Sequence, residues 1–193
     1  QAREPIARLL QSVLAARQRC APDPSRPPPL LAKVGPDLTE AQVADIAEVA
    51  LDAGVDGLIV GNTTLERPPR LVSRFRSEAG GLSGRPLAAH AHACLSGMYR
   101  ATRGQIPLIG CGGISSGADA YARIRAGASL VQIYSALVFQ GPALVRTIKD
   151  DLARRLRADG FTSVGDADRD GHARRDSSMV AGRNAGAPQG LAR

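Results

Sequence analysis

Aromatic residues are scarce in this sequence. Tryptophan is absent, and phenylalanine and tyrosine together make up 3% of the 193 residues. Proteins that bind single-stranded nucleic acid stack its bases on aromatic side chains, and this chain has too few of them to form such a platform. The formal charge of +7 does not reverse that conclusion, because the arginines are scattered along helical stretches and the C-terminal tail. We therefore expect no nucleic-acid partner and interpret the charge as a solvated surface, with a basic face that meets anionic lipid as the alternative.

Cysteine and long hydrophobic runs are lacking as well. Cys20, Cys94 and Cys111 lie far apart without a CxxC pair, which argues against a zinc site and gives no disulfide framework. No stretch reaches the roughly 18 uninterrupted apolar residues that a membrane span needs. The first residues lack the basic region and apolar run of a signal peptide, and also an initiator methionine, so a start further upstream is expected. These absences favour a reduced, cytosolic setting.

What the sequence does contain is a repeat of short apolar runs, each followed by an amphipathic stretch. A helix is predicted first, over residues 4–19, and the five prolines of residues 21–29 form a connector that cannot be helical. The strands and helices that follow predict a parallel sheet covered by helices. They fit a doubly wound open sheet or part of a (βα)8 barrel, because a complete barrel usually needs about 250 residues. The predicted strands are residues 30–34, 57–60, 106–109 and 130–133.

Capping patterns mark the starts of two predicted helices. Thr39 and Gln42 have the spacing of a capping box, in which each side chain satisfies a free backbone N–H of the first turn. Ser116 and Asp119 repeat the pattern of a capped start further along the chain. Both helices follow predicted strands, as the βα repeat requires.

Polar and glycine residues collect just after each predicted strand, where parallel α/β folds bind ligands. Gly112 and Gly113 let backbone N–H groups approach an anion closely, and the start of the next helix adds a favourable dipole. Together with the end of the following strand they predict a phosphate site. The residues at the four strand ends are Lys33, Asn62 with Thr63, Gly112 with Gly113, and Tyr134 with Ser135.

Each of these positions also has a purely structural interpretation. Lys33 belongs to a strand that looks buried, so it either faces an anion or reaches the surface, where Asp37 is a candidate partner. The run from Asn62 to Thr64 would serve equally as the cap of a following helix. His90 and His92 lie two positions apart and point to different faces of a helix, which favours surface histidines over a metal pair.

Five motifs extend the pattern beyond the strand ends. They are KVGPDL at 33–38, DGLIVGNTT at 56–64, GGLSGRPL at 80–87, IPLIGCGGI at 106–114 and AGASLVQIYS at 126–135. In order and spacing they resemble the class 2 dihydroorotate dehydrogenases, the quinone-dependent, membrane-associated enzymes of pyrimidine biosynthesis. The resemblance covers about residues 4–165. GGLSGRPL and ASLVQIYS are specific to this class, whereas the glycine-rich GCGG run is not.

The resemblance implies the C-terminal part, about four βα units, of a TIM-type barrel. It implies FMN as the cofactor and no metal, with Lys33 beside the flavin ring. The implied reaction oxidises dihydroorotate to orotate in UMP biosynthesis, and quinone reoxidises the flavin. Asn62 and Thr63 would hydrogen-bond the orotate ring or its carboxylate. The implied cofactor-binding residues are Lys33, Gly61, Gly84, Gly113, Tyr134 and Ser135.

Two departures from the family pattern matter. Gly61 stands where the family usually has Thr or Ser, so only a backbone contact survives there. The family's serine general base, first barrel strands and membrane helices correspond to segments upstream of Gln1. We therefore expect this chain alone to be inactive and to expose an apolar patch where those strands belong. The alternative is a non-catalytic half-barrel that binds phosphate or FMN and associates with a partner or with itself.

The end of the sequence differs in composition from the rest. From about Asp166 it turns to Asp, Arg, Gly and Ala without apolar periodicity. We predict a partial FMN-binding barrel domain over residues 1–165 and a disordered tail over residues 166–193. The parent enzyme would be peripheral to the cytoplasmic membrane, whereas this piece is expected to be soluble or cytoplasmic.

Overall fold

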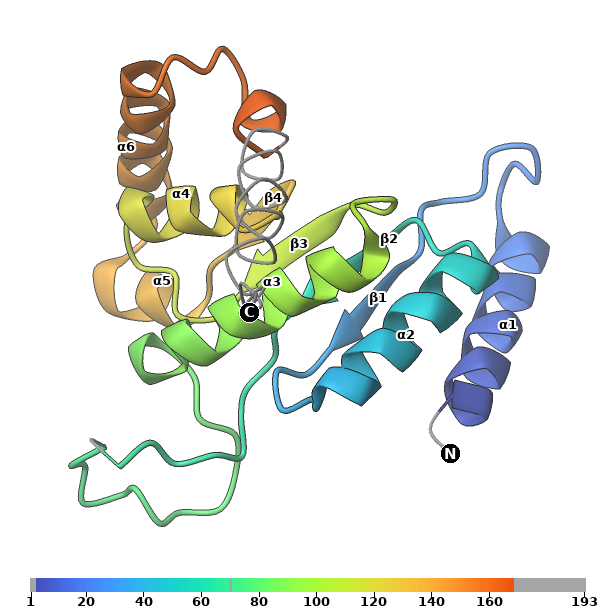
Figure 1. Cartoon of the computed structure of the whole chain (residues 1–193), viewed down its shortest axis with the longest axis horizontal. Coiled ribbons are helices and arrows are strands. Elements are labelled where there is room, and N and C mark those ends of the chain that lie inside the picture. The colour runs from blue at the N-terminus through green and yellow to red at the C-terminus, as the bar shows by residue number, and fades with distance from the viewer. Residues whose placement is uncertain (1–2, 70, 169–193) are drawn as a thin grey trace, which may run out of the picture.

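Four strands form a parallel sheet whose order, β1-β2-β3-β4, is also their order along the chain (Figure 1). The computed structural model describes residues 3–69 and 71–168. A doubly wound sheet reverses its strand order at a switch point, whereas a (βα)8 barrel adds each strand beside the previous one. The observed order therefore favours a partial TIM-type barrel over the open sheet. The strands are β1 Leu31–Val34, β2 Gly57–Val60, β3 Leu108–Cys111 and β4 Leu130–Gln132.

The four strands end level with one another. Val34 pairs with Val60, Val60 with Gly110, and Gly110 with Val131. Because the strands are parallel, the residues that follow these positions lie along one edge of the sheet. The polar and glycine residues predicted as a site are thus brought to that edge by the register alone.

The start of β3 differs from the prediction. The strand begins at Leu108, two residues after the predicted start at Ile106. Pro107 has no N–H to donate to the ladder, so it stays outside the strand. Its carbonyl still accepts a hydrogen bond from the N–H of Leu58, at 3.0 Å.

The helices begin where the capping patterns predict. Thr39 accepts from the N–H of Gln42, and the Gln42 side chain accepts from the N–H of Thr39, which confirms the capping box. Ser116 accepts from the N–H of Asp119. The short α5 was not predicted, because its six residues are too few to show a helical period. The helices are α1 Arg3–Cys20, α2 Glu40–Ala53, η1 Arg85–Leu87, α3 Ala88–Thr102, α4 Gly117–Arg125, α5 Ser135–Gln140 and α6 Ala143–Ala158.

The main core lies between the sheet and helices α2 and α3. Its central side chains, Leu58, Val60, Leu95, Met98 and Leu108, are at most 1% exposed. Helix α1 packs on the outside of α2, and Leu10 is its buried residue. A smaller cluster joins α4 to α6 and consists of Ile114, Ala120, Leu144 and Ile148.

The outer strands are less buried than predicted. In β1, exposed and half-buried residues alternate, and Lys33 is exposed. The prediction that Lys33 lies in a buried strand is wrong, because β1 is an edge strand with one hydrogen-bonded neighbour. At the other edge Leu130 is 62% exposed, and Val138 and Phe139 of α5 are 70% and 86% exposed. These are exposed apolar side chains at the β4 end of the sheet, and whether they form the expected apolar patch stays a prediction.

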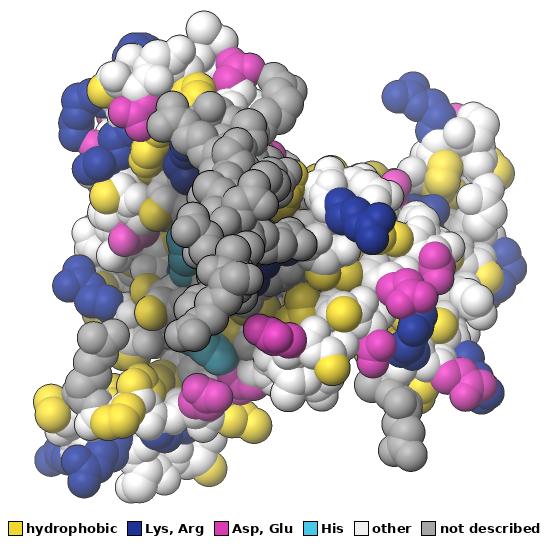
Figure 2. Space-filling model, in the orientation of Figure 1, with side chains coloured by type: hydrophobic (Ala, Val, Ile, Leu, Met, Phe, Trp, Pro, Cys, Tyr) yellow, Lys and Arg dark blue, Asp and Glu magenta, His cyan; other side chains and the backbone are white. Residues whose placement is uncertain are grey.

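The long connection between β2 and η1 projects from the rest of the molecule (Figure 1). Figure 2 shows hydrophobic and basic side chains gathered on this projection, at the lower left. Arg67 joins the outgoing and returning parts of this connection. Its guanidinium donates to the carbonyl oxygens of Arg76, Glu78 and Gly80. These hydrogen bonds hold the two ends of the connection together.

Beyond α6, residues 164–168 form a further helical turn, and Ala167 is fully buried against the core. The folded part thus continues past residue 165, the predicted end of the barrel domain. Residues 169–193 of the predicted disordered tail lie outside the described residues. Among the helices of the described ranges, none is long and apolar enough to cross a bilayer.

Candidate functional site

A cavity of about 830 Å³ opens at the carboxyl ends of the strands. This is the edge at which parallel α/β folds place their ligands. All four strand ends contribute to its lining. Gly61 is the one predicted site residue that is not part of the lining. The predicted site residues that line the cavity are Lys33, Asn62, Thr63, Gly84, Gly113, Tyr134 and Ser135.

Gly61 follows β2 and lies against Cys111 at the end of β3. Its φ is +127°, and a Cβ added there would overlap the carbonyl oxygen of Cys111. Its N–H donates to the carbonyl of Val34 at 3.2 Å. With this local backbone, position 61 accepts only glycine, so a relative with Thr or Ser there must place its backbone differently.

The turn after β3 packs directly on the first turn of α3. Gly112 and Gly113 have φ values of +104° and +72°, which L side chains rarely adopt. A Cβ on Gly113 would lie 2.5 Å from the Cα of Ala88. The two glycines thus let the turn pack closely on α3, and both belong to the cavity lining, where a glycine turn is a suitable backbone donor to an anion.

The start of α4 contributes less to an anion site than its position after the glycine turn predicts. The carboxylate of Asp119 accepts hydrogen bonds from the N–H of Ser115 and from the hydroxyls of Ser115 and Ser116. These bonds hold the pKa of Asp119 below its ordinary value, although burial alone would raise it. A carboxylate of the chain itself therefore occupies the positive end of this helix, so the glycine turn is the better donor to an anion.

Arg123 is the residue that sequence reasoning missed. It lies in α4 and is 4% exposed, and its Nη2 donates to the carbonyl oxygens of Gly112 and Ala88, both at 2.7 Å. Burial lowers the pKa of Arg123. An arginine next to Ile124 on an arginine-rich helix looks like a surface residue in the sequence, so only the packing of α4 against the glycine turn reveals its position.

Residues 81–84 of the segment with the sequence GGLSG belong to the cavity lining. Leu82 forms a bridge with Thr64, and a Cβ on Gly81 would overlap the side chain of Thr63. The hydroxyls of Ser83 and Ser135 lie 2.9 Å apart. This segment therefore brings the ends of β2 and β4 together, although they are not neighbouring strands.

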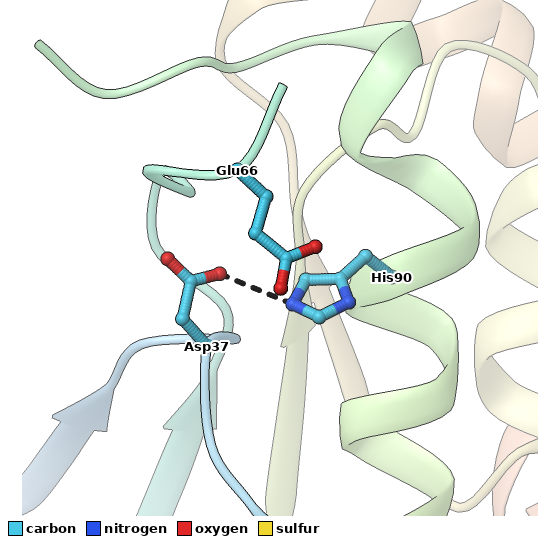
Figure 3. Close-up of side chains that lie close together, drawn as sticks. All are labelled: Asp37, Glu66 and His90. Atoms are coloured by element: carbon cyan, nitrogen blue, oxygen red, sulfur yellow. Dashed lines mark hydrogen bonds and ion pairs between the residues drawn. The ribbon is translucent and has the colours of Figure 1, made fainter. Parts of the chain in front are cut away.

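A network of hydrogen bonds and one ion pair connects the segments that follow β1 and β2 with α3 (Figure 3). Asp37, which follows β1, accepts from the N–H of Leu65 at 2.8 Å and from the buried hydroxyl of Thr64 at 2.5 Å. His90 of α3 points toward Asp37, with 3.1 Å between Nε2 and Oδ1, and Glu66 reaches the same space. Burial raises the pKa of Asp37, but the hydrogen bonds outweigh it and hold the pKa below its ordinary value.

This network decides two of the alternatives that the sequence leaves open. The hydrogen-bond and ion-pair partners of Asp37 are Thr64, Leu65 and His90, rather than Lys33. The hydroxyl of Thr64 accepts from the N–H of Glu66 at 3.0 Å, which is a local turn and not a helix cap. In residues 61–69 and 71–84 the described chain forms no helix. Asn62 and Thr63 are thus left facing the cavity.

Comparison with known proteins gives consistent matches. A family model described as dihydroorotate dehydrogenase matches residues 1–156. The chain is 59% identical over 167 residues to the dihydroorotate dehydrogenase (quinone) of Xanthobacter autotrophicus, covering 86% of this chain and 47% of that protein. It is 47% identical over 167 residues to the mitochondrial dihydroorotate dehydrogenase (quinone) of Mus musculus, with 86% and 42% covered. The chain thus spans about half the length of the curated relatives it matches.

Solved structures agree with these matches. The crystal structure of DHODH from Eimeria tenella in complex with ferulenol has a TM-score of 0.80 and 40% identity. The match covers 86% of this chain and 47% of that one. The ligand-free structure from the same organism has a TM-score of 0.76 and 44% identity, with 83% and 49% covered.

Proposed function

The chain belongs to the dihydroorotate dehydrogenase family, and from this premise we propose that it supplies the FMN-holding part of a quinone-dependent enzyme of pyrimidine biosynthesis. The whole enzyme would oxidise dihydroorotate to orotate, pass the hydride to FMN and reoxidise the flavin with quinone. It would be peripheral to the membrane that holds the quinone. The observation that carries the proposal is the convergence of Lys33, Asn62, Thr63, Gly113 and Ser135 on one cavity.

The cavity fits a phosphate-bearing cofactor with a flat ring. Its volume of about 830 Å³ is within the range of ligand pockets. At one end, the backbone surface of Gly112 and Gly113 leaves no room for side chains and suits the phosphate. FMN, when bound, supplies a hydride acceptor that no amino-acid side chain provides.

Each proposed contact follows from the chemistry of the side chain. Lys33 places an ammonium at the cavity wall, where it stabilises negative charge on a bound ring. Ser135 offers a hydroxyl donor to the phosphate, beside the backbone of Gly113. Asn62 and Thr63 offer an amide and a hydroxyl, which suit the carbonyl, N–H and carboxylate groups of a pyrimidine carboxylate.

Proton abstraction requires a base that the proposed site residues do not provide. By family resemblance this base is a serine, and no segment of this sequence matches its motif. We therefore expect the chain by itself to bind ligands without turnover. A measurable dihydroorotate:quinone activity of the 193-residue chain would contradict this expectation.

FMN binding, followed by quenching of flavin fluorescence, tests the proposal. We expect saturable binding that weakens about tenfold in Lys33→Ala and about fivefold in Ser135→Ala, because each loses a hydrogen bond or charge at the cofactor. Lys149→Ala, on the exposed surface of α6, and Ser129→Ala, before β4, are the matched controls and should bind like wild type. Equal losses in variants and controls, or no saturable binding, would count against an FMN site in this cavity.

A further inference from the structure

Arg123 is a buried cation that lacks a full counter-charge in hydrogen-bond contact. It is 4% exposed, and within residues 3–69 and 71–168 it forms no salt bridge. Its two hydrogen bonds go to carbonyl oxygens, and its buried Nε has no acceptor. Asp119 acts on it through space, but that carboxylate is held by Ser115 and Ser116. Burying a guanidinium in this way is unfavourable unless another negative group comes close.

The two carbonyls that Arg123 holds belong to the wall of the cavity. One is that of Gly112, in the turn after β3, and the other is that of Ala88, the first residue of α3. Both accept from the same nitrogen, Nη2. Gly113 already packs against Ala88 so closely that a Cβ there would lie 2.5 Å from its Cα. Arg123 thus ties the glycine turn to the helix at the point where they touch.

The bond to Gly112 also fixes the direction of the next N–H group. The carbonyl of Gly112 and the N–H of Gly113 belong to one trans peptide unit, so they point in opposite directions. With the carbonyl directed at the buried guanidinium, the N–H is directed away from it. In the described part of the chain, this N–H donates to no backbone or side-chain acceptor. Gly113 lines the cavity, so the donor is free for a ligand.

We propose that Arg123 is a positioning residue for the cofactor phosphate: it orients the Gly112–Gly113 peptide and places a fixed positive charge one peptide unit behind the anion. This inference rests on the proposed function, because it requires an anionic group at the glycine turn. The phosphate then supplies the negative charge that Arg123 lacks within the described chain. Arg123 does not touch the ligand and acts through the peptide that it holds.

The test compares two flavins that share a ring and differ in the phosphate. The affinities of FMN and riboflavin are measured by fluorescence quenching for the full chain, for Arg123→Gln and for Arg123→Lys. Arg125→Gln is the matched control: it removes another arginine from α4, one whose guanidinium lies over the ring of Phe161 at 4.9 Å. Thermal melting of each variant separates lost affinity from lost folding.

We expect Arg123→Gln to weaken FMN binding about tenfold or more, as for a lost charge-assisted contact, and to change riboflavin binding by less than about twofold. Arg123→Lys, which keeps the charge, should recover part of the FMN affinity. If Arg123→Gln does not fold, the comparison moves to Arg123→Lys, for which a loss of about threefold confined to FMN is expected.

The contrary outcomes separate the inference from the proposed function. If wild type prefers FMN over riboflavin but Arg123→Gln binds FMN normally, or loses both flavins equally, the positioning role is refuted and the cofactor site stands. The same holds if Arg125→Gln shows the same FMN-specific loss. If wild type binds neither flavin, or binds both equally, the glycine turn takes no phosphate and the inference fails. Binding neither also counts against the proposed FMN site.

Discussion

The hydroxyl of Ser83 lies 2.9 Å from the hydroxyl of Ser135, although 52 positions separate them in the chain. Ser83 belongs to the segment that returns from the long projecting connection, and Ser135 is the first residue of α5. Their contact closes the cavity between two strand ends that do not neighbour each other in the sheet. The shape of the proposed phosphate site therefore depends on a loop as well as on the sheet.

Ser83→Ala should weaken FMN binding about twofold to tenfold, because the loop loses the hydrogen bond that holds it against α5. The melting temperature should stay close to wild type, since the pair is exposed. Fluorescence titration with FMN measures the first quantity. Ser77→Ala, in the exposed outer part of the same connection, is the control and should bind FMN normally. An unchanged affinity of Ser83→Ala would show that the contact has no part in the site.

Gly113→Ala should destabilise the fold and abolish FMN binding. The substitution forces a left-handed backbone, which costs about 1–2 kcal/mol, and also drives the new Cβ into Ala88. Gly160→Ala is the matched control, because Gly160 has φ +80° but no atom within 4 Å of the added Cβ. Urea unfolding should show a loss of about 1–2 kcal/mol for Gly160→Ala and a clearly larger loss for Gly113→Ala. Equal losses would mean that the turn can move away from α3.

Asp37→Asn should destabilise the fold at neutral pH, by about 1 kcal/mol, because the carboxylate accepts from Thr64, Leu65 and His90. The pKa of Asp37 is lower in the folded chain than its ordinary value of 3.8. The carboxylate's contribution is therefore complete above that value and is lost as the pH falls through the folded pKa. Melting temperatures of wild type and variant should differ at pH 7, and the difference should begin to shrink only as the pH falls below about 4, towards the folded pKa.

Asp150→Asn, on the exposed face of α6, is the control for this comparison. It should have no effect on the melting temperature at neutral pH, since surface ion pairs contribute little. A difference between wild type and Asp37→Asn that persists unchanged at pH 3 would mean that the charge of Asp37 is not what stabilises the network.

Leu95→Ala should cost about 2–5 kcal/mol of unfolding free energy, because Leu95 is fully buried between α3 and the sheet and its removal leaves a cavity. Leu65→Ala, at a position 77% exposed, should stay within about 0.5 kcal/mol of wild type. Urea unfolding of both variants gives the comparison. Similar losses at the two positions would contradict the assignment of the core.

Much of the fold could be predicted because its strands and caps depend on local pattern. The apolar runs gave the four strands, and Thr39 with Gln42 gave the start of α2, since a capping box involves residues three apart. β3 begins at Leu108 rather than at the predicted Ile106, because Pro107 has no N–H to donate to the sheet. The resemblance placed seven of its eight site residues around the cavity, and their roles there stay a prediction.

What could not be predicted depends on packing between distant segments. The exposure of Lys33 reflects the position of β1 at the edge of the sheet, which an apolar run does not reveal. Arg123 is a charged residue beside Arg125, which suggests a solvated position, and its burial results from the packing of α4 against β3 and the glycine turn, where it donates to the carbonyl of Gly112. The contact of Ser83 with Ser135 requires the path of a long loop.

The order of the strands in the sheet has a consequence for how the chain acquires its structure. Each strand pairs with the one made just before it, so β2 can join β1 before β3 and β4 have been synthesised. The sheet can therefore grow in one direction as the polypeptide leaves the ribosome, with each new βα unit adding to a surface that already exists. The glycine turn and Arg123 belong to the last units added. The phosphate end of the cavity would then be the part completed last during synthesis.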